Sequence, residues 1–425
     1  MLLLLKSAES VLLLGLPVHL AHGVLLYAAL RRFTSTRRRA IIAAALFFGT
    51  LLHLLPFLLL AAGFADTSLR QHLGDLSLYI PLLITAQSLV LLAPIITAAG
   101  VVYGFRRAWR RRIVRAIAGL VLAGAVLCAV AVPLRIHHDM TTIEVERRDV
   151  RVPGLAPELE GFRIGVLADM QMDVVTDPAR IRAYVDSLAA QDPDLVLFPG
   201  DLLAWSYNMG EAAAPLARLR PPFGVFAAIG DHDYWSGLDS VVAALRAVGV
   251  DVLADERRVL EVRGCRIEVA GLTNIYDFPA GREDVARVCG GDAAGALRLV
   301  VMHAMAPHLG EALRDAGVRL VVSGHTHGGQ IGVWFYGIWL STALLEASQV
   351  DGLRDDGVLA SYVSRGLGMS VVKLRHGATP SVALLTLTGG RTPSSVVGDG
   401  RPRPSWEDGR PRPSRRPIHR HAIPH

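Results

Sequence analysis

Residues 321–330 read Val-Val-Ser-Gly-His-Thr-His-Gly-Gly-Gln, and the architecture of the chain follows from this stretch. The β-branched run that leads into it, Val318–Val322, predicts a buried strand that breaks at Gly324. Because side chains alternate across a strand, His325 and His327 cannot bind one metal ion from an extended segment. In a turn opened by glycines, each imidazole can instead approach one ion of a pair, and neutral imidazole is the commonest metal ligand. The alternative is two solvated loop histidines.

Upstream, the same arrangement recurs, with a short apolar strand followed at once by an acid or an imidazole. The predicted strands are Phe162–Leu167, Leu195–Phe198, Gly224–Ile229, Leu297–Met302 and Val318–Val322. The residues that follow them are Asp169, Asp201, Asp231, His303 and the pair His325/His327. A single Asp after a strand is more often a turn residue or a helix cap. Since ligands gather beyond the carboxyl ends of strands in layered α/β sheets, five such positions in order predict one metal site.

The first third of the chain has a different character. Apolar residues make up 52% of the sequence, the mean hydropathy is +0.38, and the excess lies before residue 135. Four stretches there approach or exceed the roughly 20 residues that cross a bilayer as a helix. They are residues 11–30, 40–65, 78–105 and 116–134. Residues 1–135 are therefore predicted to be an all-α transmembrane region of four helices.

The arginines predict how this region is oriented. One arginine-rich loop follows the first apolar stretch, and another lies between the third and the fourth. The positive-inside rule places both loops in the cytoplasm, so an even number of spans puts the chain beyond residue 135 outside. We therefore predict a multi-pass protein of the cell membrane with an extracytoplasmic soluble domain. Because the net charge of +6 resides in these loops and a C-terminal tail, no specific nucleic-acid binding is expected.

The C-terminal tail, residues 390–425, changes composition again. The segment Gly400–Ser405, rich in Pro and Arg, recurs as Gly409–Ser414. Such repeats cannot bury a core, so the tail is predicted to be disordered.

The order of the acids and imidazoles resembles that of the calcineurin-like metallophosphoesterase superfamily. The resemblance covers residues 142–389 and is most specific at Gly324–Gln330. It implies a four-layer α/β/β/α sandwich with two divalent metal ions at the strand ends, here in a membrane-anchored member. It also implies hydrolysis of phosphoric esters, in which paired ions about 3.5–4 Å apart clamp the phosphate and turn a bridging water into a hydroxide nucleophile.

Residue by residue, the resemblance implies two ligand sets joined by one bridging carboxylate. Asp169 and His327 would hold the first ion. The second ion would be held by Asp231, His303 and His325, and Asp201 would bridge both ions.

Other positions would act on the substrate. His232 would be the general acid or a phosphate contact, oriented by Asp233. Arg365 would contact a substrate phosphate, with a surface salt bridge as the alternative. Seven aromatic residues after the metal motifs suggest an apolar or lipid-linked phosphoester or phosphodiester, unless they only complete the core. They are Trp205, Tyr207, Trp235, Trp334, Phe335, Tyr336 and Trp339.

Two positions depart from the family pattern. Gln171 stands where most members have His, and Asp231 stands where most have Asn. Gln171 offers only a neutral amide oxygen, or holds a water. Since oxygen ligands suit harder ions, the site is expected to favour Mn²⁺ or Mg²⁺, with Fe or Zn²⁺ as alternatives. The departures also leave open a catalytically silent domain that senses metal or phosphate and is coupled to the membrane helices.

Overall fold

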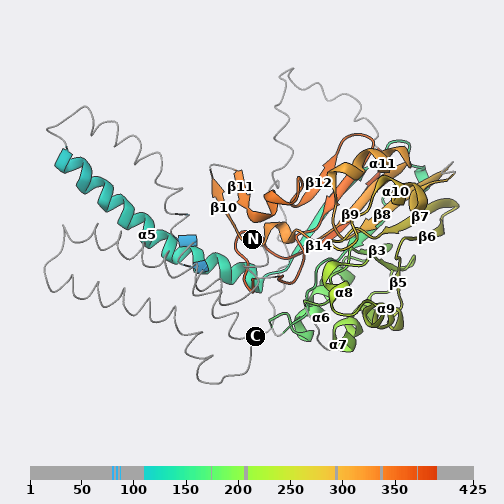
Figure 1. Cartoon of the computed structure of the whole chain (residues 1–425), viewed down its shortest axis with the longest axis horizontal. Coiled ribbons are helices and arrows are strands. Elements are labelled where there is room, and N and C mark those ends of the chain that lie inside the picture. Colours follow the sequence, from blue (N-terminus) through green and yellow to red (C-terminus); the bar gives the residue numbers. More distant parts are fainter. Residues whose placement is uncertain are drawn as a thin grey trace, which may run out of the picture. The chain divides into compact units, whose positions relative to one another are not determined.

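The computed structural model describes residues 79–80, 83–84, 87, 110–173, 175–204, 209–291, 295–335, 338–370 and 372–389. These residues form two compact units (Figure 1). The described residues up to Met140, together with Ile331–Ser341 and Val371–Gly377, form one, which we call the α5 unit. The remaining described residues form the other, which we call the sandwich unit.

The α5 unit contains the helix α5 (Arg110–Thr141) except for its last residue, and the antiparallel hairpin of β10 (Gly332–Phe335) and β11 (Ile338–Ser341). Its apolar cluster consists of Leu83, Val132, Ile136 and Leu374. The predicted transmembrane stretch at 116–134 lies within α5, whereas residues 11–30, 40–65 and most of 78–105 are outside the described residues. No described helix is both long enough and apolar enough to cross a membrane. The predicted tail, residues 390–425, also lies outside the described part of the chain.

The sandwich unit is built on two mixed six-stranded sheets. In spatial order, the first sheet contains β1 (Glu144–Arg151), β14 (Ser381–Thr388), β2 (Arg163–Val166), β3 (Leu195–Phe198), β4 (Val225–Ala227) and β5 (Val250–Val252). The second contains β12 (Gly352–Asp355), β13 (Ala360–Val363), β9 (Val318–Ser323), β8 (Ala296–Met302), β7 (Cys265–Leu272) and β6 (Glu256–Val262). Strands β2, β3 and β4 are parallel to one another, as are β7, β8 and β9. Each set therefore ends at one edge of its sheet.

Helices connect these strands. The α-helices are α6 (Pro178–Ala189), α7 (Met209–Ala213), α8 (Asp231–Trp235), α9 (Leu238–Ala247), α10 (Arg282–Cys289) and α11 (Gly310–Asp315). The 3₁₀ helices are η3 (Pro157–Leu159), η4 (Ala214–Arg218), η5 (Pro307–Leu309), η6 (His327–Gly329) and η7 (Thr342–Leu345). Asp177 caps α6 by accepting a hydrogen bond from the backbone N–H of Arg180, with Pro178 in the first turn.

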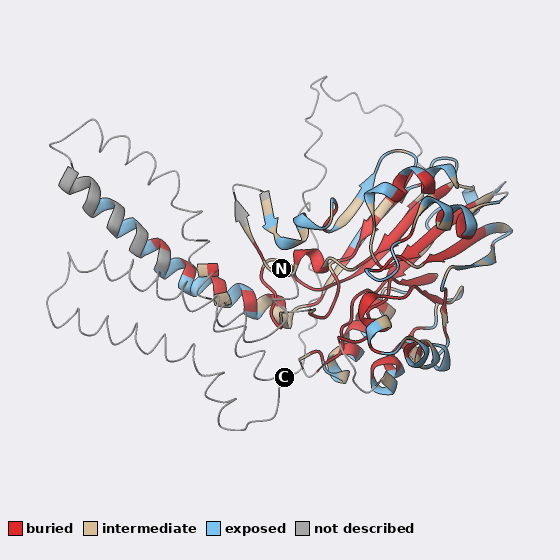
Figure 2. Cartoon of the chain, in the orientation of Figure 1, coloured by how far each residue is buried: buried red, intermediate tan, exposed pale blue. Residues whose placement is uncertain are grey.

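The central strands of the sandwich unit are mostly buried (Figure 2), and their alternating side chains belong to different apolar clusters. Leu195 and Leu197 of β3 pack between the sheets, whereas Val196 and Phe198 pack against α6 and α9. In the second sheet, Val321 faces the cluster that includes α10 and α11. Three apolar clusters therefore lie between four successive layers: helices, the first sheet, the second sheet and helices. This arrangement confirms the predicted α/β sandwich.

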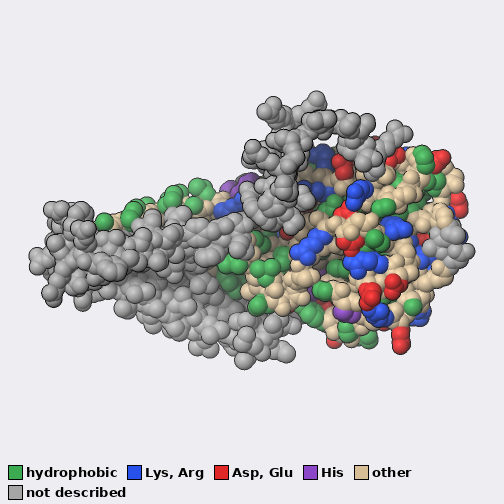
Figure 3. Space-filling model, turned by 90° about the horizontal axis from the view of Figure 1, so that it is seen from above, with side chains coloured by type: hydrophobic (Ala, Val, Ile, Leu, Met, Phe, Trp, Pro, Cys, Tyr) green, Lys and Arg blue, Asp and Glu red, His purple; other side chains and the backbone are tan. Residues whose placement is uncertain are grey.

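On the face shown in Figure 3, basic and acidic side chains of the sandwich unit are interspersed. The described residues visible on this face of the sandwich unit form no patch of a single charge.

Candidate metal centre

The predicted ligands come from both sheets and meet at one edge. Asp169, Asp201 and Asp231 follow strands β2, β3 and β4 of the first sheet. The imidazoles of His303, His325 and His327 follow β8 and β9 of the second. The acids and the imidazoles are therefore brought together by the packing of one sheet on the other.

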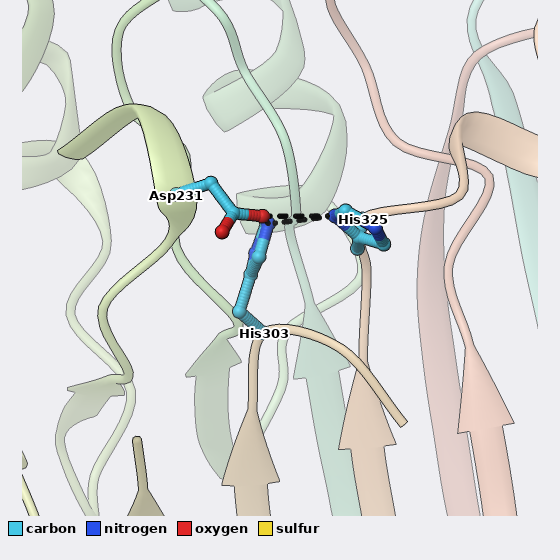
Figure 4. A group of neighbouring side chains, drawn as sticks. All are labelled: Asp231, His303 and His325. Atoms are coloured by element: carbon cyan, nitrogen blue, oxygen red, sulfur yellow. Dashed lines mark hydrogen bonds and ion pairs between the residues drawn. The ribbon is translucent and has the colours of Figure 1, made fainter. Parts of the chain in front are cut away.

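Three of these side chains form a triangle of ligand atoms (Figure 4). The Oδ2 atom of Asp231 lies 3.2 Å from Nε2 of His303 and 3.1 Å from Nδ1 of His325. The two imidazole nitrogens are 3.2 Å apart. Ligands bound at about 2.1 Å in a tetrahedral or octahedral shell lie roughly 3.0–3.4 Å from one another, so the triangle has the dimensions of three ligands to one ion.

The hydrogen bonds around the triangle leave lone pairs facing inward. Nδ1 of His303 lies 3.1 Å from the carbonyl oxygen of Pro199, which can only accept, so Nδ1 carries the proton and Nε2 is unprotonated in the neutral ring. The backbone N–H of Tyr276 donates to Oδ1 of Asp231 at 2.7 Å, whereas buried Oδ2 has no hydrogen-bond donor among the described residues. Without a metal ion, a proton on Nε2 would fill the gap to Oδ2 of Asp231, and a bound cation would replace that proton.

A second group adjoins the first through His303. It consists of Asp169, Asp201 and His303, with Nε2 of His303 3.5 Å from Oδ2 of Asp201. The backbone N–H of His325 lies 2.9 and 3.1 Å from the two carboxylate oxygens of Asp169 and so fixes that side chain. Because the one unprotonated nitrogen of His303 can bind a single ion, a centre for two ions would need the carboxylate of Asp201 as the shared ligand.

His327, predicted to share an ion with Asp169, is buried near it but belongs to neither group of described residues. A Cβ built at Gly366 would lie 3.1 Å from Oδ2 of Asp169 and 3.3 Å from Nδ1 of His327. The side chains of Asp169 and His327 therefore both lie next to Gly366. His327 stays a predicted ligand of the ion that Asp169 would hold.

Gln171 occupies the position where the family carries an imidazole. Its Nε2 donates to Oδ2 of Asp201 at 2.5 Å. Its Oε1 is buried and has no hydrogen-bond partner among the described residues. A buried amide oxygen without a donor is suited to a cation, but the amide also occupies one oxygen of the carboxylate predicted to bridge the ions.

The backbone around the ligands is strained. Positive φ angles occur at Asp169 (50°), Gln171 (48°), Asp201 (60°), His325 (71°) and His327 (52°). This region costs free energy for residues other than glycine, and such strain gathers at functional sites. Glycines make the close approach possible, because a Cβ at Gly230 would lie 2.1 Å from Oδ1 of Asp201.

The centre is strongly anionic. Burial and the charges of Asp233, Asp169 and Asp231 raise the pKa of Asp201 well above its usual range, although His303 opposes this. Burial would also raise the pKa of Asp231, but the imidazoles of His303 and His325 hold it well below its usual range. Burial lowers the pKa of His303, yet the surrounding carboxylates outweigh burial and raise it to about 10. The site therefore attracts positive charge, as a site for two dications requires.

The predicted acid, His232, lies beside the centre. Its backbone N–H donates to Oδ1 of Asp201 at 2.9 Å, and its Nδ1 contacts the carbonyl oxygen of Ala204. Its Nε2 lies 3.3 Å from Oγ of Ser370.

Asp233 does not orient His232 as predicted. Its carboxylate instead accepts the backbone N–H groups of Asp201 (2.7 Å), Leu202 (2.9 Å) and Gly230 (3.0 Å). Asp233 therefore ties together the two loops that carry Asp201 and Asp231, and the carbonyl of Ala204 contacts the imidazole in its place.

Arg365 forms the salt bridge that the sequence left as the alternative to a phosphate contact. Its Nη2 lies 2.8 Å from Oε2 of Glu144 and 3.7 Å from Oε2 of Glu146. Burial lowers the pKa of Arg365, but these two carboxylates raise it above its usual value, so the guanidinium is held as part of an ion pair.

Of the seven aromatic residues singled out above, Trp235 lies at the centre, with its ring centroid 5.1 Å from that of His232. Trp339 belongs to the α5 unit. Trp205, Tyr207 and Tyr336 lie outside the described residues, as do the side chains of Trp334 and Phe335.

Two residues at the centre were missed by sequence reasoning. Tyr276 binds Asp231 through its backbone, and its ring contacts that of His325 with centroids 5.1 Å apart. Ser370 contacts His232, while its N–H donates to Oε1 of Gln330 at 3.0 Å. Tyr276 follows β7, whose carboxyl end lies at the same edge as β8 and β9. That position was the available signal, but no acid or imidazole marks it.

Comparison with known proteins agrees with this geometry. The sequence profile of the family "Calcineurin-like phosphoesterase" matches residues 162–329, which contain every proposed metal ligand. Over residues 162–329 the chain is similar to the calcineurin-like phosphoesterases. It is a metallophosphoesterase with a paired Asp/His cluster, a hydrolase acting on phosphoester bonds.

Three relatives show the range of similar proteins. The uncharacterized metallophosphoesterase YkuE of Bacillus subtilis is 27% identical over 283 residues, which cover 65% of this chain and 97% of YkuE. The phosphodiesterase YaeI of Escherichia coli is 29% identical over 234 residues, 53% of this chain and 82% of YaeI. A transmembrane protein with metallophosphoesterase domain of Danio rerio is 27% identical over 197 residues, 43% of this metallophosphoesterase and 44% of the relative.

Proposed function

We propose that this metallophosphoesterase hydrolyses phosphodiesters at a binuclear centre. The observation that carries the proposal is the triangle of Asp231, His303 and His325, with its lone pairs facing inward and a second ligand group adjoining it. The printed name of YaeI supports a diester as the substrate class.

The ligand residues divide into two sets that share Asp201. Asp231, His303 and His325 would hold one ion, and Asp169 with His327 the other. When bound, two divalent ions neutralise the phosphate oxygens and lower the pKa of a water between them.

His232 is proposed to deliver a proton to the leaving-group oxygen. Because the carbonyl oxygen of Ala204 accepts the proton on Nδ1, the ring would donate from Nε2 in its doubly protonated form. The backbone bond from His232 to Asp201 keeps this ring at the edge of the centre.

Hydrolysis of bis(p-nitrophenyl) phosphate by the purified chain tests the proposal. Turnover is expected with Mn²⁺ and with Mg²⁺, and weaker turnover is expected with Zn²⁺. Gln171 offers an oxygen where the family usually has imidazole, and Asp231 offers a charged carboxylate where it usually has a neutral amide, so the site suits harder ions. The His303→Ala variant should lose turnover. Metal analysis of protein purified without added metal checks the preference, and stoichiometric zinc at both positions would refute it.

A catalytically silent sensor is the alternative. The bond from Gln171 to Oδ2 of Asp201 favours it, since this amide competes for the bridging carboxylate. Phosphate binding without turnover under any of the three metals would establish the sensor and exclude the esterase.

We also propose that the chain is anchored in the cell membrane with the sandwich unit outside the cytoplasm. The four apolar stretches and the two arginine loops support this, as does the printed name of the Danio rerio relative. The protein should stay with membranes after alkaline extraction, and protease added to intact cells should cleave the sandwich unit. Release by alkali, or full protection in intact cells with cleavage after lysis, would overturn anchoring and orientation, respectively.

A further inference from the structure

Two exposed aromatic rings stand beside the metal centre without a part in holding the ions. We propose that Trp235 and Tyr276 form an aromatic platform that stacks on a planar ring of the substrate, such as a nucleobase, while the phosphate lies at the metal centre. This inference rests on the proposed phosphoesterase function and adds a substrate class to it.

The two rings have the geometry of a stacking surface. Their planes are parallel within 3° and their centroids are 6.4 Å apart. Trp235 is 36% exposed and Tyr276 is 56% exposed, so both residues are accessible to a ligand from solvent. Because the faces share one orientation, a single planar ligand can lie parallel to both, and bases stack on such rings regardless of sequence.

Each ring is attached to a different part of the centre. The ring of Tyr276 packs edge-on to His325, and the backbone of Tyr276 holds Asp231. The ring of Trp235 packs edge-on to His232. An ester whose phosphate lies between the metal ligands and His232 would therefore carry its organic group next to the platform.

The polar edges of both rings are fixed by acids. Nε1 of Trp235 donates to Oδ2 of Asp277 at 2.7 Å, and the hydroxyl of Tyr276 donates to Oε2 of Glu346 at 2.8 Å. These bonds restrict rotation of the rings and place negative charge at the rim. The rim repels a phosphate, which directs the anionic end of a substrate to the metals and its neutral aromatic end to the platform.

A matched control lies close by. Phe278 is also an exposed aromatic residue, at 52%, but its ring packs edge-on to Tyr234 rather than to a residue of the centre. Removing this ring takes away a similar aromatic area without touching the platform.

The test compares ligands that carry one phosphate and differ in the organic group. Titration calorimetry of the Mn²⁺-loaded chain gives the Kd of AMP, ribose 5-phosphate and octyl phosphate. AMP is expected to bind roughly 10-fold more tightly than ribose 5-phosphate, because only AMP carries a base to stack. The ratio of the two Kd values cancels any damage that a substitution does at the phosphate end.

Single substitutions test whether the preference for AMP over ribose 5-phosphate depends on the rings of Trp235 and Tyr276. Trp235→Ala and Tyr276→Ala should each bring the ratio close to 1, whereas Trp235→Phe, Tyr276→Phe and Phe278→Ala should keep most of it. Equal binding of AMP and ribose 5-phosphate, or a preference that survives both alanine variants, would overturn the platform. If octyl phosphate bound more tightly than AMP, the two rings would form a surface for an alkyl chain and not a platform for a planar ring. Absence of binding by all three ligands and by inorganic phosphate would overturn the proposed function as well.

Discussion

Asp201→Asn is expected to lower kcat/KM for bis(p-nitrophenyl) phosphate by about 10³-fold or more. Asp201 is the carboxylate proposed to bridge the two ions, and one of its oxygens lies 3.5 Å from the imidazole common to both ligand groups. An amide in its place removes a negative charge from between two dications, and a metal ion contributes several kcal/mol of transition-state stabilisation. The loss should appear mainly in kcat, and the bound metal should fall below two ions per chain.

Asp192→Asn is the matched control. Asp192 also has a positive φ angle, 53°, but its side chain is 89% exposed in a loop outside the centre. The same chemical change there should leave kcat/KM within about twofold of the unchanged protein, as expected for a surface substitution. An Asp201→Asn protein that kept more than a tenth of the activity with two bound ions would show that Asp201 does not bridge.

Asp233→Ala is expected to lower the free energy of unfolding by about 3–5 kcal/mol. The buried carboxylate accepts three backbone N–H groups, and each donor left without a partner costs about 1–3 kcal/mol, partly offset by the removal of a buried charge. Activity should fall with stability, because two of those N–H groups belong to the loop that carries Asp201. Urea denaturation followed by near-UV circular dichroism measures the loss.

Two further variants sharpen this prediction. Asp233→Asn keeps one accepting oxygen and should lose less stability than the alanine variant. Asp239→Ala, an exposed acid in the first turn of α9, should change stability by no more than about 0.5–1 kcal/mol. If Asp233→Ala abolished activity at unchanged stability, the residue would instead act through His232, as first predicted from the sequence.

The ligand positions were predictable because they obey a pattern that is local in sequence. Asp169, Asp201, Asp231, His303 and His325 each follow a short apolar strand, and parallel strands bring their carboxyl ends to one edge. The alternation in β3, with Leu195 and Leu197 on one face and Val196 and Phe198 on the other, likewise follows from its two buried faces.

What escaped prediction depends on the backbone of distant loops. Asp233 looked like a partner for the adjacent His232, because nothing in the sequence shows that three N–H groups of two loops converge on it. The carbonyl of Pro199 selects the tautomer of His303, because it accepts the proton on Nδ1 and so leaves Nε2 to face the other ligands. Tyr276 carries no metal-ligand group, and its role depends on its backbone and on the face of its ring.

Anomalous diffraction from crystals of the Mn²⁺-loaded protein tests the central claim most directly. A manganese peak is predicted within bonding distance of Oδ2 of Asp231, Nε2 of His303 and Nδ1 of His325, with a second peak beside Asp169 and Asp201. Ions bound elsewhere, or a triangle that stays metal-free at saturating Mn²⁺, would contradict it.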